Sequence, residues 1–163
     1  MAILEIKKFN DSVLKKKCRK VGKIDEEIKK LIVDMTQTMV KSNGIGISAP
    51  QVGVLKRIIV IRTNLSGEGF FELINPKILE KSKETEIIEE GCLSFPGVFL
   101  KIKRPKTIEV EGLDINGKKI RLMAKGFSAR IFQHEIDHLD GILFFNRLSF
   151  FKRLKFKLKK PWN

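Results

Sequence analysis

The segment from Phe127 to Leu139 constrains the fold of this chain more than any other. Its apolar residues recur at the spacing of a helix, and Asp140-Gly141 follows as a stop signal. The same segment carries His134 and His138, which are the only two histidines of the chain. We therefore expect a fold built around one helix that presents both histidines.

The spacing of these histidines also indicates a chemistry. His134, Glu135 and His138 form a His-Glu-x-x-His pattern, in which residues four apart lie on one helical face and can reach one metal ion. A divalent metal lowers the pKa of a water that it binds and polarises a carbonyl. Glu135 can take the proton of that water and return it to the leaving group. The pattern predicts a metal hydrolase; the other interpretation is two histidines satisfied on the surface or in the core.

A third metal ligand has to come from another residue type. Catalytic metal sites usually have three protein ligands and one open position. Asp140 is the only acidic residue after His138, so a downstream ligand is nearly unavailable. Cys92 is the best upstream candidate, because a thiolate is a strong ligand; otherwise it is a small buried residue. For Cys18, within a basic run, we expect the buried role.

The rest of the chain predicts an α+β domain in which strands and helices do not alternate regularly. We expect small antiparallel or mixed sheets around the central metal-bearing helix, with an N-terminal helix and a C-terminal amphipathic helix. Asn-Gly at 116–117 predicts a hairpin between the last two strands. The expected helices are 25–41, 127–139 and a basic one at about 147–160, and the expected strands are 57–62, 71–74, 85–89, 107–113 and 119–123.

Length and charge set further expectations. The 163 residues suit a single domain, 1–163. No segment approaches the roughly 20 apolar residues of a membrane span, and the first ten residues do not resemble a signal peptide, so we expect a cytoplasmic protein that does not bind membranes. The net charge of +14 predicts attraction to a polyanion such as nucleic acid, or simply a solvated lysine-rich surface.

Three short segments together resemble one protein family. They are Gly44-Ile45-Gly46-Ile47-Ser48-Ala49-Pro50-Gln51, Glu90-Gly91-Cys92-Leu93-Ser94 and Gln133-His134-Glu135-Ile136-Asp137-His138. In this order and spacing they resemble the peptide deformylases, and the resemblance covers nearly the whole chain. Ser48 is a small departure, because members often carry alanine there.

The resemblance implies both an activity and a metal site. The activity is removal of the formyl group from the N-terminal formylmethionine of newly synthesised proteins, with release of formate. It implies that Cys92, His134 and His138 bind one divalent metal, natively Fe²⁺, for which Zn²⁺, Ni²⁺ or Co²⁺ can substitute. It also implies that Glu135 is the general acid and base.

The resemblance further implies an oxyanion hole made by the side-chain amide of Gln51 and the backbone N–H of Leu93, where one donor can contribute about 2.7–4 kcal/mol. The substrate methionine needs an apolar slot near the metal. We expect its wall at Ile45, Gly46, Phe127 and Ile131; the alternative is ordinary core. Glu90 is expected either to pair with Arg104 and fix the loop of Cys92, or to be a solvated charge.

Two other functions remain open from the residues alone. A zinc protease shares His-Glu-x-x-His but needs a downstream ligand and a protein-sized cleft. A basic RNA-binding module with a structural metal would explain the charge, although no RNA-binding signature is present. For the tail we expect the apolar face to pack on the domain and the basic face to dock on the ribosome; the alternative is a merely packed terminal helix.

Overall fold

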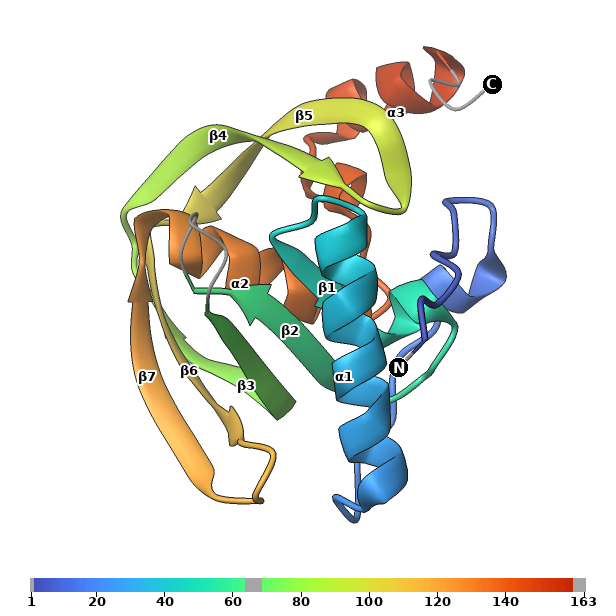
Figure 1. Ribbon diagram of the computed structural model, residues 1–163. Coiled ribbons are helices and arrows are strands. Elements are labelled where there is room, and N and C mark those ends of the chain that lie inside the picture. The colour runs from blue at the N-terminus through green and yellow to red at the C-terminus, as the bar shows by residue number, and fades with distance from the viewer. Residues whose placement is uncertain (1, 64–68, 160–163) are drawn as a thin grey trace.

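The structure is a computed structural model that describes residues 2–63 and 69–159. Within these residues, three α-helices accompany two antiparallel sheets (Figure 1). The helices are α1 (Glu26–Lys41), α2 (Gly126–Leu139) and α3 (Phe150–Lys159), with 3₁₀ turns η1 (Ser12–Lys15), η2 (Ala49–Val52) and η3 (Phe144–Arg147). The larger sheet has the order β1 (Gly46–Ser48), β2 (Ile58–Arg62), β3 (Phe70–Lys81), β6 (Thr107–Leu113), β7 (Lys119–Lys125), and the smaller one pairs β4 (Thr85–Cys92) with β5 (Phe95–Pro105).

Two helices sandwich the larger sheet, because successive residues of a strand point to opposite faces. In β2, Ile59 and Ile61 join the core around α2, which includes Phe132, Ile136 and Leu139. The alternate residues Ile58 and Val60 join the core under α1, which includes Ile32, Met35 and Met39. The helix α2 is therefore buried between the larger sheet and the β4–β5 hairpin (Figure 1).

The two long predicted helices are confirmed. Asp25 caps α1, its side chain accepting a hydrogen bond from the Ile28 N–H at 3.1 Å. The helix α2 ends where expected, and Gly141 has a φ of +70° just beyond it. The hairpin of β6 and β7 is also confirmed, with Gly117 at a φ of +81° in its turn.

The prediction for β3 was wrong at its end. The expected strand 71–74 ends just before Asn75-Pro76, but β3 continues through these residues to Lys81. Asn75 adopts a φ of +54°, and its side chain both donates to and accepts from the backbone of Val21. The register shifts between Ile74 and Lys77, so a bulge accommodates the proline.

The β4–β5 hairpin is longer than the sequence indicated. β4 runs past Glu89 to Cys92, and β5 was not predicted at all. Pro96 and Gly97, near the start of β5, are residue types that argue against a strand in the sequence. Near its end, Arg104 occupies a buried position and breaks the apolar pattern. An arginine in a sequence indicates a surface position, so the inward face of this strand was hidden.

The tail differs from its prediction in both start and orientation. Residues 144–147 form η3, and α3 begins at Phe150; Lys160 lies outside the described residues. Phe156 is buried and stacks on Phe145 with ring centroids 5.5 Å apart. However, Phe151 is 80% exposed and Leu158 is 75% exposed, so the expectation that the apolar face packs on the domain was wrong. No helix in the described part of the chain is long and apolar enough to cross a membrane.

Candidate metal centre and its cavity

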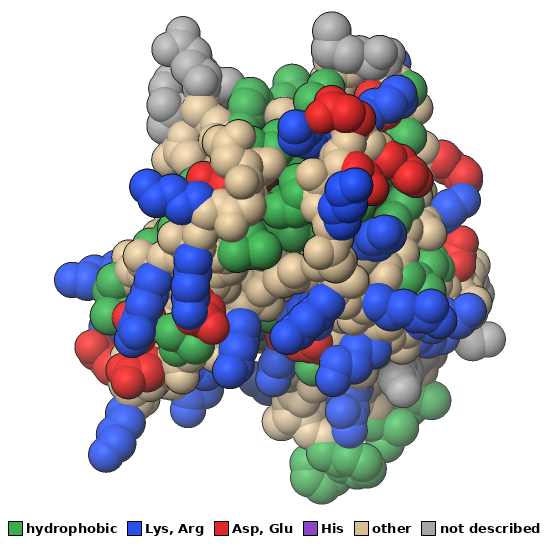
Figure 2. Space-filling model, turned by 90° about the horizontal axis from the view of Figure 1, so that it is seen from below, with side chains coloured by type: hydrophobic (Ala, Val, Ile, Leu, Met, Phe, Trp, Pro, Cys, Tyr) green, Lys and Arg blue, Asp and Glu red, His purple; other side chains and the backbone are tan. Residues whose placement is uncertain are grey.

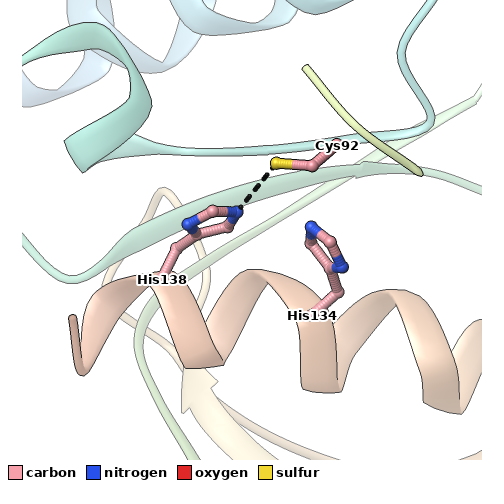
Figure 3. Close-up of side chains that lie close together, drawn as sticks. All are labelled: Cys92, His134 and His138. Atoms are coloured by element: carbon pink, nitrogen blue, oxygen red, sulfur yellow. Dashed lines mark hydrogen bonds between the residues drawn. The ribbon is translucent and has the colours of Figure 1, made fainter. Parts of the chain in front are cut away.

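The fold brings Cys92, His134 and His138 together. The histidines lie one turn apart on α2, and Cys92 reaches them from the end of β4 (Figure 3). The Cys92 Sγ atom lies 3.3 Å from His138 Nε2. One ligand atom from each of the three residues lies within 4.8 Å of the others. The three side chains thus converge on one point from two separate elements.

The donor set fits a divalent transition metal. A thiolate at about 2.3 Å and an imidazole at about 2.05 Å from a tetrahedral ion lie roughly 3.5 Å apart, close to the observed Sγ–Nε2 separation. His134 Nδ1 is 3.0 Å from Glu90 Oε2, so its other ring nitrogen is available to the site. His138 is 1% exposed and burial lowers its pKa well below the usual value, which favours the neutral imidazole that binds metals.

Glu90 is the centre of a buried ionic cluster behind the histidines. It accepts hydrogen bonds from Arg104 Nε at 2.6 Å and Nη2 at 3.0 Å, and from Arg130 Nη1 at 2.6 Å. Burial by itself raises the pKa of Glu90, but hydrogen bonds from His134 and Arg104 outweigh it and bring that pKa to about 2. The predicted Glu90–Arg104 pair, which joins β4 to β5, is therefore confirmed, and the contacts of Glu90 with Arg130 and His134 connect the hairpin to α2.

The cluster continues from Glu90 to the C-terminal segment. Arg104 Nη1 donates to Asp137 Oδ2 at 2.8 Å, and Asp137 lies on α2 just before His138. Arg147 of η3 donates to both oxygens of Asp137, through Nε at 2.9 Å and through Nη2. A chain of hydrogen bonds therefore joins Arg147, shortly before α3, to the imidazole of His134. It passes through Asp137, Arg104 and Glu90.

Ser48, where many members of the similar family carry alanine, orients the side chain of Gln51. The Ser48 backbone N–H and the Ser48 hydroxyl both donate to Gln51 Oε1 at 2.9 Å. The opposite end of the amide, Nε2, is therefore turned toward Cys92 Sγ at 3.6 Å and Ser94 Oγ at 3.3 Å. A hydrogen-bond donor on a buried side chain consequently faces the three convergent side chains.

Glu135 lies in the same site, and its carboxylate has a raised proton affinity. Burial raises the pKa of its carboxyl to about 7, against the lowering effect of nearby His134. Its Oε2 atom is buried and has no hydrogen-bond partner among the described residues. The carboxylate presses on β1, because a Cβ built on Gly46 would lie 2.5 Å from Glu135 Oε1. Only glycine at this position leaves room for that carboxylate.

A cavity of about 480 Å³ opens beside these groups. Its lining combines Gln51, Cys92, Leu93, His134 and Glu135 with the four residues predicted for the substrate slot, Ile45, Gly46, Phe127 and Ile131. His138, behind them, reaches the site through its contact with Cys92. Every site residue predicted from the sequence therefore lies in or directly behind one cavity.

Comparison with known proteins decides the family. The sequence model described as polypeptide deformylase matches residues 3–154. The peptide deformylase of Thermodesulfovibrio yellowstonii is 51% identical over 166 residues, which cover 98% of this chain and 100% of that protein. This chain belongs to the peptide deformylase family. It is a metal-dependent hydrolase that removes the formyl group from the N-terminus of nascent proteins, so neither the zinc protease nor the RNA-binding module describes its primary function.

Solved peptide deformylases have the same fold. The crystal structure of the Thermotoga maritima protein has a TM-score of 0.87 and 44% identity, covering 91% of this chain and 99% of that chain. The Ehrlichia chaffeensis protein, in complex with actinonin, has a TM-score of 0.88 and 43% identity, covering 98% and 99%. The α+β class predicted from the sequence is thus confirmed.

Several residues around this deformylase site were not identified from the sequence. Arg130 and Asp137 lie on α2, and Arg147 follows in η3. Charged residues in a sequence usually indicate a solvated face, so these three were not expected near the site. Arg130 and Asp137 are instead 3% and 6% exposed. The sequence held one signal, and it concerned Arg130 alone. This residue precedes His134 by one helical turn, so the two side chains lie on the same face of the helix.

Proposed function

We propose that Cys92, His134 and His138 hold the metal, and that Glu135, Gln51 and Leu93 act on the formyl group. The convergence of the three donor atoms within 4.8 Å, at the wall of a cavity lined by the other residues, carries this proposal. When bound, the metal activates water and polarises the formyl carbonyl. The remaining work falls to the protein's own side chains and backbone.

Glu135 is the proton carrier in this proposal. Its carboxylate takes a proton from the water whose oxygen adds to the formyl carbon. It then delivers that proton to the methionine nitrogen as the C–N bond breaks, which releases formate and a free N-terminal amine. Burial raises the pKa of the Glu135 carboxyl, which makes its carboxylate a stronger base for taking that proton.

Gln51 and Leu93 stabilise the negative charge that develops on the formyl oxygen. Gln51 Nε2 donates from one side, and Ser48 keeps the amide in that orientation through Oε1. Leu93 contributes its backbone N–H from the β4–β5 turn, beside the cavity. Donors fixed before the reaction stabilise the transition state without having to reorganise.

The substrate's methionine side chain occupies the apolar part of the cavity. Ile131 is buried, whereas Phe127 and Ile45 are about half and one-third exposed, so the slot has a closed end and an open rim. Gly46 brings backbone close to Glu135 at its inner edge. The open rim leaves room for the rest of a nascent chain, because only the N-terminal methionine of that chain enters the slot.

A pair of substrates tests this function and separates it from proteolysis. The expected result is formate release from formyl-Met-Ala-Ser without cleavage of its internal peptide bonds, and no reaction of unformylated Met-Ala-Ser. Cleavage of internal bonds in either peptide without formate release would contradict it. A variant in which Phe127 becomes Ala should raise KM for formyl-Met-Ala-Ser more than it changes kcat, because it weakens binding of the side chain alone.

For the resident metal we propose ferrous iron, on the basis of the family resemblance and of the ligand set. One thiolate and two imidazoles also suit zinc, nickel and cobalt. A thiolate-ligated ferrous site is sensitive to oxygen. The iron-loaded protein should lose activity in air while the nickel-loaded protein keeps it, with Cys92 oxidation followed by mass spectrometry. Equal stability of both forms would contradict iron as the working metal.

We also propose that residues 1–163 form one cytoplasmic domain that works at the ribosome, with α3 as a contact. Support comes from the basic residues Lys152, Arg153 and Lys155 of α3 and from its exposed Phe151 and Leu158, a surface with no partner within the described residues. Deleting residues after Phe150 should weaken co-sedimentation with ribosomes in low salt while formyl-Met-Ala-Ser turnover persists. Unchanged co-sedimentation would leave α3 as a terminal helix only.

A further inference from the structure

A line of exposed basic residues crosses the body of the domain away from the cavity. Six of the nine residues from Lys15 to Lys23 are lysine or arginine, and none is acidic. All six side chains are exposed, and so is the neighbouring Lys56. We call this surface, Lys15–Lys23 with Lys56, the basic strap. Cys18 and Val21 are its only buried residues.

The backbone of the strap is fixed to the domain at several points. The Cys18 N–H donates to the Leu139 carbonyl at 2.8 Å, where α2 ends. Arg19 pairs with Lys56 in a parallel bridge, which sets the two basic side chains next to each other. Val21 exchanges two hydrogen bonds with the Asn75 side chain at the β3 bulge. These hydrogen bonds hold the backbone that carries the charges at defined positions on the domain.

The strap has no counterions among the described residues. Within that part of the chain, none of its seven basic side chains forms an ion pair or a side-chain hydrogen bond. Some basic residues elsewhere do have acidic partners, as Lys106 pairs with Glu84 at 2.6 Å and Lys119 with Glu111 at 3.0 Å. Clustering like charges without partners is unfavourable in the free protein, and a polyanion removes that repulsion.

The surroundings of the strap are also basic. The strap ends at the start of α1, in the lower part of Figure 1. Figure 2 shows the molecule from that side, where Lys and Arg side chains cross the face in a broad band with fewer Asp and Glu side chains among them. Lys77, beyond the β3 bulge, and Lys118, in the β6–β7 turn, are exposed too. The positive charge therefore extends beyond the strap itself.

We propose that the basic strap is a docking surface for the phosphate backbone of RNA. A row of cations on neighbouring residues of one segment matches a linear polyanion, because successive phosphates can each meet a lysine or an arginine. A membrane surface fits less well, because interfacial anchors need exposed apolar residues and both apolar side chains of the strap point inward. The strap begins next to the tail, since Leu14 of η1 shares a core with Phe145 and Phe156. It extends the proposed ribosome contact from α3 to the domain body, and RNA binding by the strap can be tested without ribosomes.

The test compares two full-length variants of equal charge. The strap variant carries Lys16→Gln, Lys17→Gln, Lys20→Gln and Lys56→Gln. The control carries the same change at exposed residues elsewhere, Lys81, Lys83, Lys101 and Lys103, for which no ion pair is found within the described residues. Both should turn over formyl-Met-Ala-Ser like the parent protein, which shows that they are folded. Binding of a fluorescein-labelled, unstructured RNA oligonucleotide is followed by anisotropy.

We expect the strap variant to bind RNA about tenfold more weakly than the control variant. The slope of log affinity against log salt should fall by roughly 0.7 for each phosphate that the variant no longer neutralises, hence by up to about 3. Equal weakening in the two variants would overturn the proposal, because net charge alone would then explain binding. A second arm uses vesicles that contain phosphatidylglycerol. If the strap variant lost vesicle binding as strongly as RNA binding, the assignment to RNA would be wrong.

Discussion

The helices α2 and α3 look alike in the sequence and differ in the folded protein. Both have apolar residues at helical spacing with charged residues between them. In α2 the charged residues Arg130 and Asp137 are buried as well, because Arg130 pairs with Glu90, and Asp137 with Arg104 and Arg147, behind the histidines. In α3 even the apolar residues Phe151 and Leu158 are exposed. Periodicity thus determines which residues share a face, whereas the partner elements determine whether that face is covered.

The largest expected difference between the helices concerns stability. Phe132 of α2 is 3% exposed and packs edge-on against Phe71, so Phe132→Ala should lower the free energy of unfolding by about 3–5 kcal/mol. Phe151→Ala in α3 should change it by no more than about 0.5 kcal/mol. Urea unfolding of the nickel-loaded proteins measures both. Similar losses in the two variants would mean that α3 packs on the domain as the sequence pattern indicates.

The next prediction tests the chemical side of the α2 region. Gln51→Leu removes the donor that faces Cys92, so kcat should fall by about 10²–10³. Metal content should not change, because Gln51 is not one of the proposed ligands. A rise in KM at constant kcat would instead assign Gln51 to ground-state binding.

Arg147 joins the two regions, and changing it tests whether the segment before α3 positions the metal ligands. Arg147→Gln removes both hydrogen bonds to Asp137, so the dissociation constant for Ni²⁺ should rise about tenfold. Chelator competition measures the constant, and the visible spectrum of the cobalt form reports ligand geometry. Arg153→Gln on α3 is the matched control and should change neither. Lower stability with unchanged metal affinity and spectrum would limit Arg147 to a structural role.

The smallest expected effect is that of Ser48→Ala. It removes one of two hydrogen bonds to Gln51 Oε1 and leaves the backbone bond in place. The loss in transition-state stabilisation should be about 0.5–1.5 kcal/mol, measured from kcat. An effect as large as that of Gln51→Leu would show that the hydroxyl alone orients the amide.

The sequence could predict those parts of this protein that depend on local pattern. The helix that holds His134 and His138, its stop at Gly141 and the β6–β7 hairpin all follow from spacing and turn residues. The third proposed ligand, Cys92, could be reached by elimination, because only one carboxylate follows the histidines. The pair of Glu90 and Arg104 was found only as one of two interpretations.

What could not be predicted depends on long-range contacts. The bulge at Asn75 exists because Val21 supplies backbone partners for its side chain, and no local signal indicates that contact. The inward face of β5 was missed because Arg104 is neutralised by residues of β4 and α2. The exposure of α3 could not be foreseen, since the sequence does not show which element lies beside it.

The most direct measurement is formate release by Glu135→Gln, with metal content determined on the same sample. Glu135 is 4% exposed, and the glutamine side chain has nearly the same size, so the metal should be retained in full. Turnover of formyl-Met-Ala-Ser should fall by at least about 10²-fold, because the proton carrier is absent. Full metal content with unchanged turnover would contradict a hydrolytic role for Glu135 and, with it, the proposed arrangement of the site.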